Sequence, residues 1–281
     1  MLPHEDPSGE GHLARPSGSG CGRRPRYVSI VAELRRATAP GSPHPAAPPV
    51  ELPAHLRSVR SLASGGSASV LLARDRRRGD HVAVKVLGVP ADAGAVLRRI
   101  EREARALARV GEHPGVASIR GCGADRFGTL WIATSFVVGP TLVDRVRAGE
   151  LLDGSEAADV LGSVADALAA VHGAGVVHGD VSPANVVLGR LGPVLVDFGI
   201  GGVDTDVGDH AWTPVVVPPE RLRGVRPRAS GDVWSAAATV QWATHPETGV
   251  SEQFRRIVER CLTVRPAERP DARAVATMLR R

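Results

Sequence analysis

Apolar and polar residues alternate in several short stretches after residue 56, and this period of two predicts β-strands. The stretch HVAVKVL is the clearest case, because Ala83, Lys85 and Leu87 fall on one face of the expected strand. This stretch spans residues 81–87, and further strands are expected at 59–62, 70–74 and 128–138. The first two lie on either side of the glycine-rich sequence ASGGSAS.

A helical period replaces this alternation between residues 92 and 110. Ile100 and Leu107 lie on one apolar stripe, and the spacing places Glu103 on the same stripe. A buried carboxylate needs a cationic partner. We therefore expect Glu103 to bind a basic side chain.

The second half of the chain is mostly helical in pattern. Apolar residues from Ala157 to Val171 predict one strongly amphipathic helix, which Gly173 and Gly175 would end. Further helices are expected at about 232–243, 251–262 and 271–280, and short strand-like pieces at 176–178, 185–188 and 194–199. Strands followed by helices predict an α+β protein with two lobes.

The first 50 residues differ in composition, since they hold 9 prolines, 6 glycines and 5 serines. We expect residues 1–55 to form a disordered, Pro/Gly/Ser-rich tail. The segment YVSIVAELRRA at 27–37 differs from the rest of the tail because it lacks proline and glycine. The simpler interpretation is a transiently helical tail segment, and the alternative is a segment that binds a partner.

Charge and cysteine content exclude several classes of function. The formal net charge of +5 comes from scattered arginines without interleaved aromatic residues, which argues against nucleic-acid binding. Three widely spaced cysteines argue against a disulfide framework or zinc site and are typical of a reducing compartment. No apolar run approaches the roughly 20 residues of a membrane span. We expect a cytoplasmic protein without a membrane span.

Two residue types occur once each. Of the 35 Lys and Arg residues, only Lys85 is a lysine, and Asn185 is the only asparagine. Lys and Asn have AT-rich codons, whereas the abundant Arg, Ala, Gly and Pro indicate GC-rich DNA. This explains why both types are rare, but not where the remaining ones stand. Lysine supplies a compact point charge that the planar guanidinium of arginine does not. Lys85 therefore invites a functional interpretation.

Seven segments carry the chemistry, in this order: VAVK with Lys85, EREARAL with Glu103, HGDVSPAN with Asp180 and Asn185, DFG with Asp197, TPVVVPPE with Glu220, GDVWS with Asp232, and CLTVRPAERP with Arg269. Together they resemble the eukaryotic-type Ser/Thr protein kinase family of bacteria over residues 58–281. The resemblance implies a two-lobed protein-kinase-like fold. The small β-rich N-lobe would span about 56–137, and the mostly helical, shortened C-lobe about 138–281.

The resemblance also implies roles for the catalytic residues. Lys85, paired with Glu103, would hold the α- and β-phosphates of ATP. Asn185 and Asp197 would bind Mg²⁺ or Mn²⁺. Asp180 would orient the acceptor hydroxyl and take its proton. The implied activity transfers the γ-phosphoryl group of ATP to a hydroxyl of a protein substrate.

A nucleotide pocket follows from the same resemblance, and it would lie between the two lobes. Its expected residues are Gly65, Gly66, Ser67, Val70, Ala83, Lys85, Thr134, Ser135, Val137 and Val187. For the apolar members, ordinary core packing is an equally good interpretation.

Several positions depart from the family pattern. Ala63 and Ala68 replace two glycines of the glycine-rich loop, Gly179 replaces the Arg before the catalytic Asp, and Ser182 replaces a Lys of the catalytic loop. Losing that Lys removes a charge from the transferring phosphoryl group, at a cost of about 1–3 kcal/mol. These departures keep open the alternative of an ATP-binding pseudokinase module. A small-molecule phosphotransferase is a further alternative, because the sequence HGD resembles the catalytic loop of that class.

Overall fold

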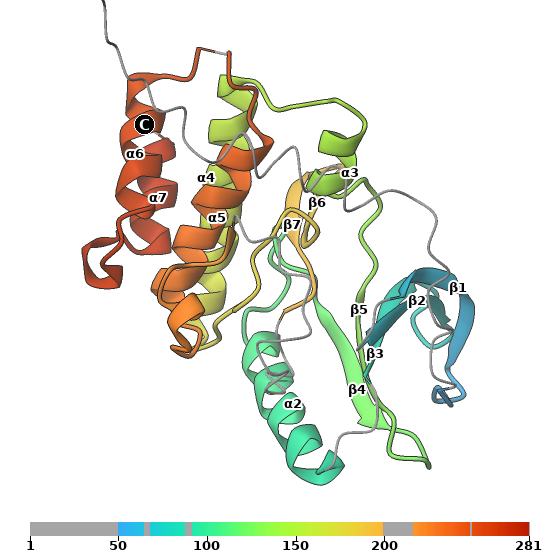
Figure 1. Cartoon of the computed structure of the whole chain (residues 1–281). Coiled ribbons are helices and arrows are strands. Elements are labelled where there is room, and N and C mark those ends of the chain that lie inside the picture. Colours follow the sequence, from blue (N-terminus) through green and yellow to red (C-terminus); the bar gives the residue numbers. More distant parts are fainter. Residues whose placement is uncertain (1–49, 65–67, 88–91, 199–215, 248, 281) are drawn as a thin grey trace, which may run out of the picture.

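The computed structural model describes residues 50–64, 68–87, 92–198, 216–247 and 249–280. Figure 1 shows a sheet-rich lobe and a helical lobe joined by the chain that leaves β5 (Leu130–Ser135). The expected α+β fold with two lobes is confirmed. Of the expected tail over 1–55, residues 1–49, with the segment 27–37, lie outside the described residues. Residues 50–55 are described, and Val50 and Leu52 pack against the apolar core of the N-lobe.

The N-lobe contains one antiparallel sheet with the strand order β1-β2-β3-β5-β4. Besides β5, its strands are β1 (Leu56–Ser64), β2 (Ala68–Asp75), β3 (His81–Leu87) and β4 (Ile119–Ala124). On β3, Val82, Val84 and Val86 are fully buried on one face, while the other face, with Lys85, is half-buried. The predicted alternation is therefore confirmed, and it turns Lys85 away from the small apolar core of the lobe.

β4 was not predicted, because its sequence IRGCGA contains two glycines and no alternating pattern. A Cβ atom on Gly123 would lie 2.9 Å from Cζ2 of Trp131. Glycine therefore lets the indole ring lie across the neighbouring strand, and packing decides a position that strand propensity disfavours.

Helix α2 (Ala93–Ala108) packs against β4 (Figure 1). It begins at Asp92, whose side chain accepts a hydrogen bond from the backbone N–H of Ala95 at 2.8 Å. Ile100 and Leu107 are buried as the stripe predicted.

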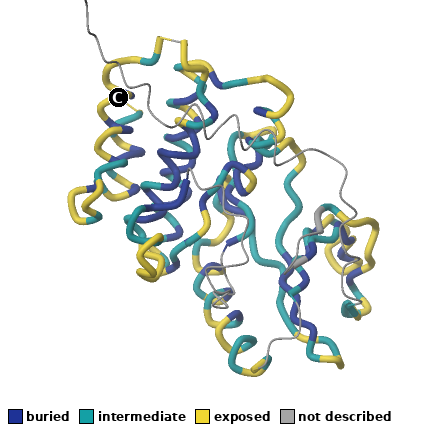
Figure 2. Tube along the Cα trace, viewed as in Figure 1, coloured by how far each residue is buried: buried dark blue, intermediate teal, exposed yellow. Residues whose placement is uncertain are grey.

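The C-lobe is built around α4 (Gly154–Gly173) and α5 (Ala229–Ala243). Its other elements are α3 (Leu142–Arg147), β6 (Val186–Gly189), β7 (Gly192–Leu195), α6 (Glu252–Cys261), α7 (Ala272–Leu279) and the 3₁₀ turns η2 (Arg221–Arg223) and η3 (Pro266–Glu268). Burial is concentrated along α4 and α5 (Figure 2). No helix in the described ranges is long and apolar enough to cross a membrane.

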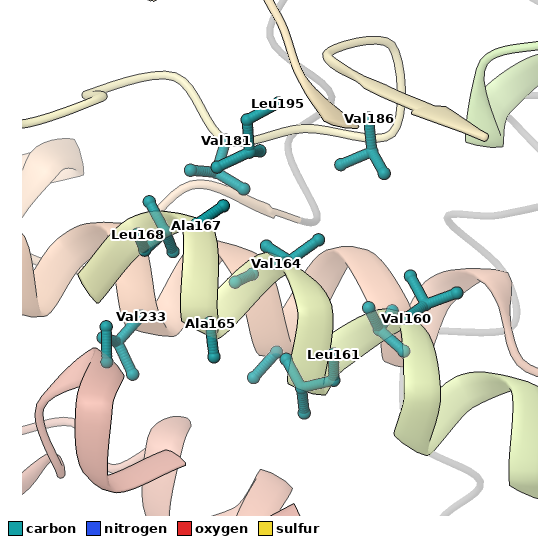
Figure 3. Packing of buried hydrophobic residues seen from close by; sticks show 14 of the residues in the cluster. Val160, Leu161, Val164, Ala165, Ala167, Leu168, Val181, Val186, Leu195 and Val233 are labelled. Atoms are coloured by element: carbon teal, nitrogen blue, oxygen red, sulfur yellow. The ribbon is translucent and has the colours of Figure 1, made fainter. Parts of the chain in front are cut away.

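The apolar face of α4 forms the centre of the core. Figure 3 shows Val164 and Leu168 of this face near Val181 and Leu195, which belong to the segments that carry the polar residues described below. The same core reaches Val233 on α5. Hydrophobic burial on α4 therefore fixes the backbone from which the functional side chains project.

The expected strand-like piece at 176–178 is wrong. These residues are irregular, because the backbone N–H of His178 donates to the carboxylate of Asp232 at 2.8 Å instead of to a neighbouring strand. The two other short pieces are confirmed with shifted bounds as β6 and β7, which pair as an antiparallel hairpin.

Candidate active site

Lys85 and Asp197 form an ion pair between the two lobes. Nζ of Lys85 lies 2.6 Å from Oδ1 and 2.9 Å from Oδ2 of Asp197. The side chains are 29% and 32% exposed, so the pair faces a partly solvated space. Lys85 comes from the middle of β3, and Asp197 lies just beyond β7. The single lysine thus reaches a carboxylate 112 positions away.

Glu103 does not bind Lys85, and the expected pair is absent from this structure. Its carboxylate accepts a hydrogen bond from Nε of Arg99, one helical turn earlier on α2, at 3.1 Å. The Glu103 side chain is 31% exposed, so it lies at the edge of the apolar stripe rather than within it. A partly solvated carboxylate can pair with the nearest arginine of its own helix, and nothing forces it toward the sheet.

Asp232 anchors the loop that follows α4. Its carboxylate accepts hydrogen bonds from the backbone N–H groups of His178 and Gly179, both at 2.8 Å, and lies 2.8 Å from Nε2 of His172. Asp232 is only 3% exposed. Sequence reasoning missed His172 in this role, although a buried aspartate in the first turn of α5 was a signal that such donors must exist.

Asp180 and Asn185 lie at the two ends of this loop and contact each other. Nδ2 of Asn185 donates to the backbone oxygen of Asp180 at 2.8 Å and to Oδ2 of its carboxylate at 3.1 Å. The amide is thereby held in one orientation, and its oxygen is left to accept other partners.

Asp180 remains accessible to solvent, but the protein atoms around its carboxyl weaken hydration and raise its pKa. The negative charge of Asp197 acts in the same direction, whereas His178, Lys85 and the bond from Asn185 oppose it. A raised pKa suits a carboxylate that has to accept a proton.

The β6–β7 hairpin brings Asn185 close to Asp197. The backbone N–H of Val196, one residue before Asp197, donates to the backbone oxygen of Asn185 at 3.0 Å. Asp197 has φ of 54°, the only positive φ among the described residues other than glycine. Such strain is maintained only where the surroundings fix it, and it is concentrated at functional sites.

His178 and Phe198 are both buried. Their rings lie 4.6 Å apart, and Nε2 of His178 is 3.1 Å from the oxygen of Val196. These contacts hold the strained Asp197 segment against the loop that carries Asp180. Neither ring is placed to react.

The donor set at Asn185 and Asp197 fits a hard divalent cation. Both residues offer oxygen ligands, which Mg²⁺ and Mn²⁺ prefer. The amide oxygen of Asn185 has the orientation described above, and the Asp197 carboxylate is bound by the Lys85 ammonium. A cation held by Asp197 would compete with the Lys85 ammonium for this carboxylate.

The face of the sheet that carries Lys85 also carries residues expected to contact a nucleotide. Val70 is paired with Lys85, and Ala83 is paired with Thr134. Directly opposed residues of antiparallel strands point to the same face. These four side chains therefore share the surface that the resemblance predicts for ATP. Gly65, Gly66 and Ser67 lie outside the described residues.

The segment after β5 meets the hairpin of the C-lobe. A Cβ atom on Gly189 would lie 3.2 Å from Cγ1 of Val137, which places Val137 beside β6 and near the buried Val187. The hydroxyl of Ser135 accepts a hydrogen bond from the backbone N–H of Ser118 at 3.0 Å and so has a structural partner.

Glu220 and Arg269 form a structural ion pair. Two nitrogens of the Arg269 guanidinium donate to the two carboxylate oxygens of Glu220 at 2.6 and 2.8 Å. The Arg269 side chain is completely buried. The hydrogen bonds from Arg269 hold the pKa of Glu220 below its ordinary value.

A small lobe with a five-stranded sheet, a helical lobe, and a Lys–Asp pair between them beside an Asp–Asn loop define a protein-kinase-like class of protein. The sequence profile of the protein kinase domain matches residues 56–244. The chain therefore belongs to the protein kinase family, rather than to the small-molecule phosphotransferases.

The relatives include bacterial Ser/Thr kinases. The chain is 33% identical over 216 residues to the serine/threonine-protein kinase PknK of Mycobacterium tuberculosis, which covers 75% of this chain and 19% of PknK. It is 33% identical over 237 residues to PkaA of Streptomyces coelicolor, covering 72% of this chain and 43% of PkaA. The chain thus spans less than half the length of these two relatives.

A solved structure is similar over most of both chains. The PknI kinase domain of M. tuberculosis shares 29% sequence identity with a TM-score of 0.62, and the match covers 80% of this chain and 94% of that domain. The expected kinase fold is therefore confirmed.

Proposed function

We propose that this protein transfers the γ-phosphoryl group of ATP to a serine or threonine hydroxyl of a protein substrate. The observation that carries the proposal is the convergence of Lys85, Asp180, Asn185 and Asp197 on one space between the lobes. Each of these residues stands in the family motif that implies its role. Relatives named as Ser/Thr kinases support the same conclusion.

The ion pair has to open for ATP to bind productively. Lys85 would leave Asp197 and bind the α- and β-phosphates as a fixed point charge. Asn185 and Asp197 would hold Mg²⁺ or Mn²⁺ through their oxygens. When bound, the cation would neutralise charge on the phosphates of ATP.

Asp180 would orient the acceptor hydroxyl and receive its proton. As the acceptor oxygen forms its bond to the γ-phosphorus, the bond from that phosphorus to the β,γ-bridging oxygen breaks and ADP leaves. The bond from Asn185 holds the Asp180 carboxylate in position during this step. Burial raises the pKa of Asp180, which makes its carboxylate a stronger base for this proton.

One observation favours a second candidate, an ATP-binding pseudokinase. Lys85 and Asp197 neutralise each other, and Glu103 is engaged by Arg99. A chain that kept this arrangement with nucleotide bound would be a poor catalyst. Gly179 and Ser182 lack the charges that the family has at these positions.

Two assays separate these candidates. An acyl-phosphate ATP probe, which acylates nearby amines, has only one lysine to label in this chain. We expect labelling of Lys85 that excess ATP suppresses, and transfer of radiolabelled phosphate from ATP to a generic Ser/Thr protein substrate but not to aminoglycosides. Labelling without transfer would favour the pseudokinase. Labelling that ATP does not suppress would contradict both.

We also infer a cytoplasmic location, where ATP is supplied and thiols stay reduced. Cys122 and Cys261 are free thiols, which supports this inference. We further propose that the segment 27–37 can bind a partner. Deleting that segment would test this proposal.

A further inference from the structure

A cavity of about 230 Å³ lies beside the Asp180–Asn185 loop, on the C-lobe side of the proposed phosphotransfer site. The loop forms one wall, with Asp180 and Ser182. The backbone at 216–218 and the segment 226–228, with the sequence Arg-Pro-Arg, form the others. A polypeptide that presents a hydroxyl to Asp180 would have its neighbouring residues in reach of this cavity.

Gly179 allows the Arg-Pro-Arg segment to approach the loop. Gly179 has φ of 78°, and a Cβ atom there would lie 3.3 Å from Cβ of Pro227. A larger residue at this position would meet the proline ring. Pro227 therefore occupies the space beside position 179, where the family has an arginine. Arg226 and Arg228 precede and follow Pro227 in the sequence.

The acidic residues that line the cavity already have partners. Glu220 is bound by Arg269 through two hydrogen bonds, and Asp232 accepts bonds from two backbone N–H groups. Asp180 is the residue proposed to receive the proton of the acceptor. None of these three forms a hydrogen bond or ion pair with Arg226 or Arg228.

Two arginines that line the cavity, by contrast, have no partner among the described residues. Arg226 and Arg228 are exposed, and their side chains form no hydrogen bond or ion pair with any described residue. A third arginine, Arg221, also lines the cavity and donates to the backbone oxygen of Val225 at 3.1 Å. Two guanidinium groups without a hydrogen-bond or ion-pair partner among the described residues therefore lie next to the proposed catalytic carboxylate.

We propose that Arg226 and Arg228 select acidic acceptor polypeptides, in which a carboxylate lies a few residues from the phosphorylated serine or threonine. This inference rests on the proposed function and names its substrate class. A guanidinium binds a carboxylate through two parallel N–H···O bonds, which gives geometric specificity as well as attraction. The same two arginines would repel a basic residue near the acceptor, so the site would also disfavour basic polypeptides.

The test is a peptide series in which one serine is flanked by alanines and a single glutamate is moved through four positions on each side. We expect glutamate at one or two adjacent positions to raise kcat/KM about tenfold over the all-alanine peptide. In the double variant Arg226→Gln/Arg228→Gln, kcat/KM for the glutamate peptide should be within twofold of kcat/KM for the all-alanine peptide. The charge-conserving variant Arg226→Lys/Arg228→Lys should keep part of the preference.

Arg223→Gln is the matched control, because Arg223 is exposed on the same segment but does not line the cavity. It should keep the full preference. A parent protein without any preference for glutamate, or a preference that survives in the Gln/Gln variant, would overturn the proposal.

A binding measurement separates this proposal from the proposed function. Fluorescent versions of the glutamate and alanine peptides, with alanine in place of serine, are titrated with the parent and the Gln/Gln variant. Tighter binding of the acidic peptide by the parent alone supports the inference even if no phosphate is transferred. Phosphotransfer without selective binding would retain the proposed function and reject this inference.

The chain itself carries three aspartates between residues 199 and 215: Asp204, Asp206 and Asp209. If these bind the arginines instead of a substrate, peptide selectivity should be absent in the parent and appear only in the variant with all three changed to asparagine. That outcome would overturn the proposal of a substrate site.

Discussion

The ammonium of Lys85 contacts both carboxylate oxygens of Asp197, while Glu103, the expected partner of Lys85, binds Arg99 instead. The two groups proposed to act on phosphate and metal therefore neutralise each other in this structure. Because both are about one-third exposed, the pair contributes little to stability and can open at small cost. ATP and a cation together offer each group a stronger partner.

Lys85→Met and Asp197→Asn should each lower phosphotransfer by at least a hundredfold, since each removes a charge that acts on the reacting phosphates. Thermal unfolding should change little, because the lost pair is partly solvated and worth about 1 kcal/mol or less. Transfer of radiolabelled phosphate and a melting curve on the same preparations measure both effects. An undiminished rate in either variant would contradict the proposed function.

Glu103→Gln tests whether the Lys85–Glu103 pair belongs to the active arrangement. We expect turnover to fall about tenfold or more, because Lys85 loses the acid that would hold it against the phosphates. Stability should change by less than about 0.5 kcal/mol, which is typical of an exposed pair one helical turn apart, like Glu103 and Arg99. Glu101→Gln is the control, since Glu101 forms the equivalent bond with Arg105 at 3.1 Å. A normal rate for Glu103→Gln would mean that catalysis does not use the pair.

The sequence predicts best where one pattern governs a whole element. The alternation in β3 and the apolar face of α4 were confirmed because burial on one face decides both. The six-residue helix α3 was missed, since it is too short to show a period. Its only signal is the reciprocal capping of Thr141 and Asp144.

The site was harder to predict than the fold. Motif spacing identified the segments that meet at Lys85, Asp180 and Asp197, because hydrophobic packing of their flanking residues fixes the backbone. It did not predict the partner of Glu103, since an exposed carboxylate chooses among nearby cations at small cost in free energy. Nor did it indicate that Gly179 has a positive φ and lies against Pro227.

Gly179→Ala should lower the free energy of unfolding more than Gly224→Ala does. Both glycines have φ of 78°, so both substitutions incur the strain of a left-handed residue, about 1–2 kcal/mol. Only at position 179 would the new Cβ meet a neighbour, Cβ of Pro227 at 3.3 Å, whereas Gly224 has no atom within 4 Å. Urea unfolding of the parent and both variants measures the difference. Equal losses would show that Pro227 moves aside without cost.

Glu220→Gln should destabilise the protein strongly at neutral pH and less in acid. The substitution leaves the buried Arg269 guanidinium without its counter-charge, which typically costs about 3–5 kcal/mol. Bonds from Arg269 to the backbone oxygens of Thr263 and Ser230 remain, so we expect the lower end of this range.

The pH dependence follows from the pKa of Glu220, which the bonds from Arg269 hold below its ordinary value. A carboxyl with a lowered pKa in the folded state stabilises the fold above its unfolded pKa, about 4.3 for glutamate, and loses this contribution as the pH falls through the folded value. The gap in unfolding free energy between parent and Glu220→Gln should therefore be constant above about pH 5 and narrow below about 4.3. Glu268→Gln, which breaks the exposed pair with Arg265, should give no gap beyond about 1 kcal/mol at any pH. A gap for Glu220→Gln that stays constant into strong acid would mean that its carboxylate charge does not stabilise the fold.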